Sequence, residues 1–261
     1  MIPRKTALVT GGTRGIGFET ASQLARMGHR VVITSRAESD AIQPALGELS
    51  GLGADPVWCE LSLEDLHSAE SLVDRVHQAV GPIDILVQNA VYQGTLNQQP
   101  LANLSAEDLQ AAWQSTISAP LLLIREAHRH MEKYAERGRI LIVGSGAGRY
   151  DPPASVADGG WGFVYGASKA ALHRLAGVMH AEHPKARTTL ITVNPGVVDT
   201  PALRATLGLN AELVLKMGAK PASDVGLALA WLATDAPREQ WHLEFVDLQK
   251  RRWEGSERGL V

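Results

Sequence analysis

The feature that most constrains this chain is a regular alternation of short apolar segments with longer segments of helical periodicity. Most of the short segments are apolar at both odd and even positions, which is typical of parallel strands covered by helices on both faces. The seven predicted strands occupy residues 6–10, 30–35, 55–60, 83–88, 139–145, 188–194 and 242–247. The predicted helices occupy residues 15–28, 38–52, 63–80, 106–133, 163–182, 201–217 and 222–234. This alternation predicts an α/β fold with a single doubly wound parallel sheet of about seven strands.

Length and composition favour one large domain. With 261 residues, of which 45% are hydrophobic, the chain is long enough to bury a substantial core. No linker, internal repeat or low-complexity tract interrupts the alternation, so we expect a single domain over residues 1–261. Residues 146–162 are rich in glycine and proline and form the longest predicted loop. Long loops in such folds usually lie over a functional site.

Charge and cysteine content limit which binding partners and which cellular compartment we expect. A net charge of −3 gives no reason to expect nucleic acid or a membrane surface as partner. Cys59 is the only cysteine, which excludes an internal disulfide and suits a reducing compartment. The first residues lack the apolar region of a signal peptide, and no apolar stretch is long enough to span a membrane. We therefore expect a cytoplasmic protein.

A glycine-rich turn, TGGTRGIG at residues 10–17, follows the first predicted strand and opens the first predicted helix. Glycines 11, 15 and 17 lack Cβ atoms and therefore let the main chain approach a pyrophosphate. The helix N-terminus adds free N–H groups and the positive end of a dipole. No Lys-Ser/Thr pair follows, so this is not a nucleoside-triphosphate loop. The alternative is a plain tight turn with no ligand.

Tyr165 and Lys169 lie four residues apart on a predicted helix, so their side chains share one face. Most pairs with this spacing are solvated surface residues. The alternative is a phenol held beside an ammonium group for acid–base chemistry, and the rest of the chain decides between the two.

Five motifs in this order resemble those of the short-chain dehydrogenase/reductase family, in its non-extended branch. They are Thr10–Gly17 for TGxxxGxG, Gln88–Val91 for NNAG, Ser145 at the end of the fifth strand, Tyr165–Lys169 for YxxxK, and Asn194–Gly196 with Thr200. The resemblance covers residues 5 to about 247 and implies a Rossmann-type fold. It also implies hydride transfer between a nicotinamide and a carbonyl or alcohol substrate, a small molecule, as in a carbonyl reductase.

The resemblance implies three catalytic residues. Tyr165 would donate a proton to the nascent alkoxide. Lys169, together with the charge of the oxidised nicotinamide, would lower the pKa of Tyr165, and its ammonium would also bind the nicotinamide ribose. Ser145 would hold the substrate oxygen. Because the other motifs of the family accompany the Tyr165–Lys169 pair, we favour acid–base chemistry over a solvated surface pair.

The resemblance also implies a set of cofactor-binding residues. Ser35 ends the second strand, where relatives that prefer NAD usually have an acidic residue, and Arg36 follows it. Two guanidinium groups, of Arg36 and Arg14, favour a 2′-phosphate, so we expect NADP(H) rather than NAD(H). Glu60 occupies the acidic adenine-contact position of the family. The full predicted set is Gly11, Thr13, Arg14, Gly15, Ile16, Gly17, Ser35, Arg36, Glu60, Leu61, Asn89, Ala90, Tyr165, Lys169, Pro195, Gly196, Val198 and Thr200.

The chain departs from the family pattern at several positions. Thr116 stands where relatives often have an Asn that supports a proton relay, and Val91 replaces the last Gly of NNAG. The loop before Tyr165 is about seven residues longer than usual by our alignment. We expect residues 146–162 and 197–218 to form the substrate pocket's movable walls; for the long loop, ordinary loop packing is the alternative. Apolar contacts would come from Trp161, Phe163 and Leu203.

Other functions are weaker alternatives. The departures at Thr116 and Val91 leave open a catalytically weak sensor that binds NADP(H). An enoyl reductase of this fold usually has a longer spacing between Tyr and Lys, and chain length disfavours a sugar-nucleotide epimerase. His128/His130 and His180/His183 lack a third metal-ligand signature. By resemblance we expect a homodimer or homotetramer, formed through faces of helices 106–133 and 163–182.

Overall fold

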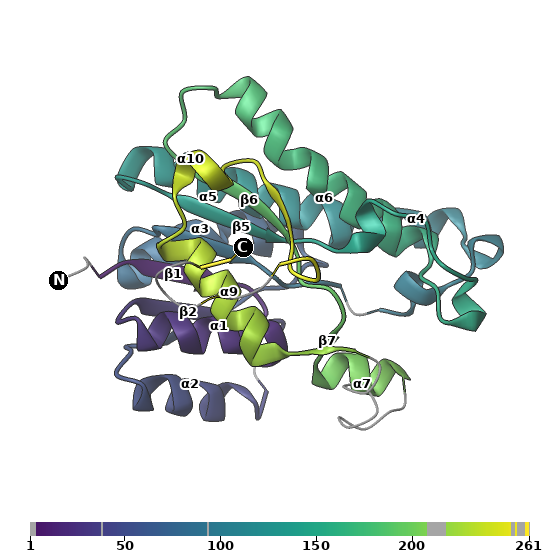
Figure 1. Ribbon diagram of the computed structural model, residues 1–261, viewed down its shortest axis with the longest axis horizontal. Helices are drawn as coiled ribbons and strands as arrows, with labels where there is room; N and C mark the ends of the chain where they lie inside the picture. Colours follow the sequence, from purple (N-terminus) through teal and green to yellow (C-terminus); the bar gives the residue numbers. More distant parts are fainter. Residues whose placement is uncertain are drawn as a thin grey trace.

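The computed structural model describes residues 4–37, 39–92, 94–207, 218–251, 254 and 259–260. Its centre is a parallel sheet of seven strands in the order β3-β2-β1-β4-β5-β6-β9 (Figure 1). The strands are β1 (Thr6–Val9), β2 (Arg30–Ser35), β3 (Val57–Glu60), β4 (Ile85–Gln88), β5 (Arg139–Val143), β6 (Thr189–Asn194) and β9 (Phe245–Asp247). Each lies within a predicted strand, so the doubly wound α/β fold is confirmed.

Nine α-helices follow the chain within the described residues. They are α1 (Gly15–Arg26), α2 (Ile42–Gly51), α3 (Leu66–Val80), α4 (Ala106–Trp113), α5 (Ala119–Tyr134), α6 (Phe163–Glu182), α7 (Pro201–Leu207), α9 (Ala222–Thr234) and α10 (Arg238–Trp241). Short 3₁₀ turns are η1 (Thr95–Gln98), η2 (Leu101–Asn103), η4 (Gly146–Gly148) and η5 (Val156–Asp158). None of the helices in these parts of the chain is long and apolar enough to cross a membrane.

The structure differs from the sequence prediction in several details, including the short elements η1, η2 and α10. The predicted helix at 106–133 is interrupted by a π-helical turn, η3 (Gln114–Ser118), because an extra residue there widens the backbone ladder. The predicted loop 146–162 contains η4 and η5. A second small sheet pairs β7 (Val198–Asp199) with β8 (Lys220–Pro221), and its strands are too short to give a periodic pattern. Of the predicted helix 201–217, residues 208–217 lie outside the described part.

The core consists of two apolar layers, one on each face of the sheet. Along β1, Ala7 and Val9 belong to the layer under α1 and α9, whereas Leu8 belongs to the layer under α3, α5 and α6. Successive strand residues point to opposite faces, so a strand buried on both sides must be apolar throughout. Figure 1 shows these two helical layers on either side of the sheet.

The sheet topology places the functional site. The strand order reverses between β1 and β4, because the chain runs outward to β3 and then returns to the other side of β1. At such a switch point the connections after neighbouring strands leave in opposite directions. The crevice between them, at the carboxyl ends of the strands, is where ligands bind in open α/β sheets.

Candidate active site

The glycine-rich turn after β1 has the shape that its sequence predicts. Gly11 has φ 64°, which favours glycine, and α1 begins at Gly15. A Cβ atom on Gly17 would lie 2.3 Å from the Gly11 carbonyl oxygen and 2.6 Å from Asn89 Nδ2. Gly17 is therefore required for the close packing of the turn, and the helix N-terminus is left facing the crevice as an anion-binding position.

Thr10 and Asn89 fasten this turn to the end of β4. The Thr10 hydroxyl accepts the N–H groups of Asn89 (3.0 Å) and Ala90 (2.9 Å). The Asn89 side chain donates to the carbonyl oxygens of Thr10 (2.9 Å) and Gly11 (3.4 Å). The polar groups of both strand ends are thus satisfied by each other, so Asn89 braces the ends of β1 and β4.

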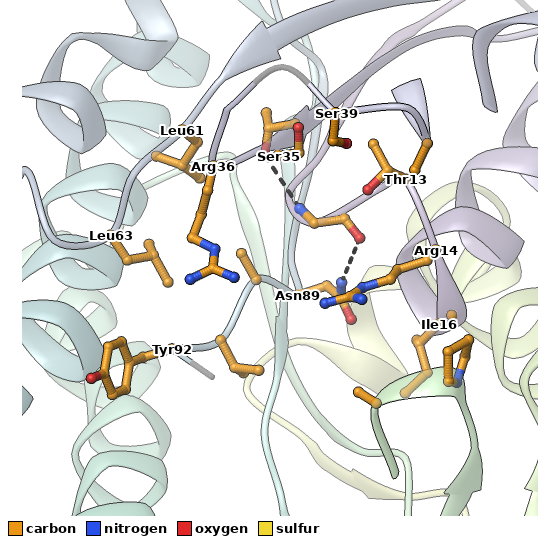
Figure 2. Close-up of a pocket in the computed structure, with 18 of the residues that line it drawn as sticks. Thr13, Arg14, Ile16, Ser35, Arg36, Ser39, Leu61, Leu63, Asn89 and Tyr92 are labelled. Carbon is orange, nitrogen blue, oxygen red and sulfur yellow. Dashed lines mark hydrogen bonds between the residues drawn. The ribbon is translucent and has the colours of Figure 1, made fainter. Parts of the chain in front are cut away.

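A cavity of about 650 Å³ opens beside the turn. Figure 2 shows Arg36, from the end of β2, and Arg14, from the glycine-rich turn, entering it from opposite sides. Arg36 is exposed, and no ion pair in the described part of the chain involves it. Of the predicted cofactor-binding residues, those on the cavity wall are Gly11, Thr13, Arg14, Gly15, Ile16, Ser35, Arg36, Leu61, Asn89, Ala90 and Thr200. We call this region the cofactor end.

The Ser35 hydroxyl, predicted from its sequence position to contact the cofactor, is instead hydrogen-bonded within the protein. Its hydroxyl accepts a hydrogen bond from the Trp58 indole N–H (2.9 Å) and donates to the Ala37 carbonyl (3.1 Å). The single hydroxyl proton is thereby used, so Ser35 does not donate to a ligand in this arrangement. It instead holds the turn that carries Arg36, and Trp58, on β3, was missed by sequence reasoning.

The remaining predicted cofactor residues lie around the cavity rather than on its wall. Glu60 is exposed at the end of β3, while the next residue lines the cavity. Pro195, Gly196 and Val198 follow β6 without reaching the wall. Thr200, farther along this connection, borders the phosphate turn, because a Cβ on Gly15 would lie 3.3 Å from its methyl group.

Asn194 fixes the connection after β6. Its buried carboxamide oxygen accepts the N–H groups of Gly146 (3.0 Å) and Gly196 (3.1 Å), and its nitrogen donates to Asp247 (3.1 Å). One side chain therefore ties together the carboxyl ends of β5, β6 and β9. The sequence motif points to this residue, but the three partners come from distant segments.

Ser145, Tyr165 and Lys169 meet at what we call the reaction end. Ser145 follows β5, and α6 carries both other residues, with Lys169 Nζ 5.8 Å from the centroid of the Tyr165 ring. Lys169 is buried, and its ammonium donates to the Val143 carbonyl at 3.1 Å. The helical spacing thus brings the pair to one place, and the strand end brings Ser145 to them.

The protonation of this cluster is set by burial. Burial raises the pKa of Tyr165, and the neighbouring Ser145 side chain acts in the opposite direction. Burial lowers the pKa of Lys169 from 10.5 to about 8. In the protein alone, Tyr165 is therefore a neutral phenol at pH 7. The lowering expected from Lys169 together with an oxidised nicotinamide stays a prediction.

A second, small cavity of about 20 Å³ adjoins the first and is lined by Tyr165 and Lys169. Thr116, in the π-helical turn, reaches this cavity, but its hydroxyl donates to the Ala112 carbonyl at 2.6 Å. Asn97 also lines it, and its Oδ1 atom is buried without a hydrogen-bond partner. Val91 lines both cavities, as expected of a side chain in place of the family glycine.

The aromatic residues of the long loop lie at the start of α6. The Trp161 indole packs against Gly166, because a Cβ there would lie 3.5 Å from two indole atoms. Phe163 is 55% exposed, and Leu203 is partly exposed on α7. Trp161 thus packs against the residue that follows Tyr165 in α6, whereas Phe163 is exposed to solvent.

Fold and site together define a nicotinamide-dependent oxidoreductase. The glycine-rich turn, the helix N-terminus and the 650 Å³ cavity fit a dinucleotide, and a half-buried phenol and a buried ammonium group lie at the far end. A family model described as short chain dehydrogenase matches residues 5–208. The chain belongs to the short-chain dehydrogenase/reductase family and is an oxidoreductase acting on CH–OH or C=O groups.

Individual relatives agree with this assignment. Short-chain dehydrogenase/reductase FrzI of Cladobotryum sp is 32% identical over 83% of this chain and 79% of its own length. The 3-oxoacyl-(acyl-carrier-protein) reductase FabG of Escherichia coli (strain K12) is 30% identical over 88% of this chain and 90% of its own. A short chain dehydrogenase from Burkholderia cenocepacia J2315, solved in complex with NADP, has a TM-score of 0.78 at 28% identity, covering 93% of this chain and 95% of that one.

Proposed function

We propose that this protein is an NADP(H)-dependent reductase of ketones or aldehydes that also oxidises the corresponding alcohols. The observation that carries the proposal is the position of a neutral, half-buried Tyr165 beside Ser145 and Lys169, next to a cavity bordered by two arginines. A phenol that keeps its proton at neutral pH is in the form required to protonate an alkoxide.

Each residue of the reaction end has one role in this proposal. A bound nicotinamide supplies the hydride for reduction and accepts it in oxidation. The Oη atom of Tyr165 carries the proton and donates it to the substrate oxygen. Ser145 holds that oxygen in place through its hydroxyl. Lys169 keeps its ammonium beside the phenol and presents it to the ribose.

The preference for NADP(H) rests on Arg36 and Arg14. A guanidinium group binds a phosphate with charge-assisted hydrogen bonds, whereas an acidic residue at the end of β2 would repel it. Ser35 and Trp58 support this arrangement by holding the turn that carries Arg36. Among similar structures, one from Burkholderia cenocepacia was solved with NADP and one from Brucella melitensis with NAD, so the proposal rests on the two arginines.

Steady-state kinetics with both cofactors test the proposal. A panel of aldehydes, ketones and secondary alcohols is screened with NADPH and NADH, or with their oxidised forms. We expect the higher kcat/KM with NADPH, and a loss of roughly tenfold or more in NADPH affinity for Arg36→Ala, with NADH affinity unchanged. Arg26→Ala, an exposed arginine at the end of α1, is the matched control. A higher kcat/KM with NADH would overturn the cofactor preference.

For the substrate, we propose a bulky hydrophobic or cyclic carbonyl compound. Trp161 packs at the start of the helix that carries Tyr165, and Leu203 lies on the connection after β6. Trp161→Ala is expected to lower kcat/KM for bulky ketones more than for small aldehydes. Equal values for wild type and variant across both groups would remove Trp161 from the substrate wall.

The oligomeric state is also part of the proposal. Trp113 (60% exposed) and Leu109 on α4, and Val178 on α6, leave large apolar side chains on the helices predicted to form the interface. We propose a homodimer or homotetramer, which light scattering coupled to size-exclusion chromatography would distinguish from a monomer. The cytoplasmic location stays a prediction.

A further inference from the structure

His173 is a titratable residue beside the reaction end that the sequence motifs do not account for. It lies on α6 one turn after Lys169, which itself lies one turn after Tyr165. At the end of β5, Gly144 donates to the Val193 carbonyl of β6 at 2.7 Å. The next amide, Ser145 N–H, donates to His173 Nε2 at 3.4 Å. Where the pairing of β5 with β6 ends, a side chain of α6 therefore supplies the hydrogen-bond acceptor for the next main-chain N–H.

The main chain around Ser145 is shaped to hold this imidazole. A Cβ on Gly144 would lie 2.4 Å from His173 Nε2, and a Cβ on Gly148 would lie 2.7 Å from its Cε1. Real Cβ atoms do not approach other atoms so closely, so the two glycines leave the space that the ring occupies. On a third side, Phe245 packs edge-on at 4.9 Å between ring centroids.

The hydrogen bond also requires one protonation state. A ring nitrogen that accepts an N–H must carry its lone pair, so the proton of the neutral ring is on Nδ1. Burial and the nearby cations Lys169, Arg149 and Arg174 lower the pKa of His173 to about 4. The acceptor at Nε2 is therefore present throughout the neutral pH range.

We propose that His173 is a positioning residue for Ser145: by accepting the Ser145 N–H between Gly144 and Gly148, it orients the serine hydroxyl toward Tyr165 and the substrate oxygen. The proposal rests on the proposed role of Ser145. The Ser145 hydroxyl lies at the start of η4, where it accepts the Ala147 N–H at 3.2 Å. A rotation of the Ser145 main chain would move this hydroxyl away from the substrate oxygen, and small misplacements of reacting groups are costly in rate.

The test uses the near-isosteric pair His173→Gln and His173→Met. Gln offers an acceptor oxygen at the distance of Nε2, whereas Met fills similar space without a strong acceptor. We expect kcat to fall roughly 10- to 100-fold in His173→Met and to recover largely in His173→Gln. NADPH affinity, measured by fluorescence titration, should stay within about twofold in both. Should the Met variant fail to fold, His173→Leu takes its place.

A double-mutant cycle separates positioning from packing. In a Ser145→Ala background, His173→Met should cause little further loss of kcat, because the hydroxyl that it orients is already gone. An equal loss in both backgrounds, or equal kcat for the Gln and Met variants, would overturn the proposal. If Ser145→Ala itself leaves kcat unchanged, the proposed role of Ser145 fails instead, and the two failures are thereby distinguished.

Discussion

At the cofactor end, the groups proposed to meet the ligand are main-chain N–H groups of a glycine-rich turn and the exposed side chain of Arg36. At the reaction end they are partly or fully buried titratable side chains whose pKa values are displaced by burial. The first end is held by reciprocal hydrogen bonds between Thr10 and Asn89. The second is held by α6, whose residues at successive turns face the end of β5.

This difference assigns separate properties to the two ends. In the proposed function, the turn with its N–H and guanidinium groups governs which cofactor binds and how tightly. The half-buried phenol of Tyr165 beside an ammonium group governs proton transfer. Substitutions at one end should therefore change affinity, and those at the other should change turnover, with Lys169 as the residue that belongs to both.

Tyr165→Phe should produce the largest effect. It removes only the phenolic hydroxyl, so the proton donor is lost while the ring still fills its place. We expect kcat to fall by about 10²–10⁴, the range of acid–base catalysis. NADPH affinity, measured by fluorescence titration, should be unchanged. If the variant reduces substrate at the wild-type rate in single turnover, Tyr165 is not the proton donor. If it binds NADPH more weakly than the wild type, Tyr165 also contributes to cofactor binding, and the two ends are not separate.

Lys169→Met should affect both ends. The buried ammonium donates to the Val143 carbonyl and lies beside the Tyr165 ring, and Met fills most of its volume without charge. Loss of a charged hydrogen bond corresponds to roughly a 10- to 100-fold change, which we expect both in kcat and in the dissociation constant of NADPH. If only one of these quantities changes, Lys169 belongs to a single end.

Gly17→Ala should damage the cofactor end alone. The added Cβ would clash with the Gly11 carbonyl and the Asn89 side chain. Asn89 cannot move away easily, because its side chain donates a hydrogen bond to the Thr10 carbonyl. We expect the free energy of unfolding to fall by about 1–3 kcal/mol and NADPH to bind more weakly. Gly47→Ala is the control, because Gly47 lies in α2 with no atom near the new methyl group. Urea denaturation should show it slightly more stable, by about 0.5–1 kcal/mol.

The sequence predicted the parts of the site that are local in the chain. Strand positions followed from continuous apolar segments, and the phosphate turn followed from glycine spacing next to a predicted strand and helix. Tyr165 and Lys169 were placed together by helical periodicity.

The parts that could not be predicted depend on pairs of residues far apart in the sequence. The Ser35 hydroxyl accepts a hydrogen bond from Trp58, 23 residues away, and the Ser145 N–H donates one to His173, 28 residues away. Neither His nor Trp carries a local signal for such a bond. The π-helical turn around Thr116 depends on packing between α4, α5 and α6, which a pattern of apolar residues does not specify.

The smallest predicted effect is a pH dependence of stability that comes from the scaffold rather than from the site. His242 accepts the Leu190 N–H at 3.2 Å, at the amino end of β6 and thus away from the carboxyl ends that form the site. Burial, with Arg238 and His180 nearby, lowers the pKa of His242 from 6.5 to about 4. Between these two values the unfolded chain binds a proton that the folded chain does not. Stability is therefore fully present above about pH 6.5 and falls as the pH is lowered toward 4.

His242→Asn should reduce this dependence, since Asn offers Oδ1 as the acceptor for Leu190 without a titrating ring. Urea denaturation at pH 7, 6 and 5 should show a shallower decline for the variant than for wild type. The kcat at pH 7 should be the same in both, because the residue lies outside the reaction end. His173 titrates over the same window, so part of the decline should persist in His242→Asn. An identical decline in both proteins would mean that His242 titrates alike in the folded and unfolded chains. A fall in kcat would mean that the amino end of β6 is coupled to the site.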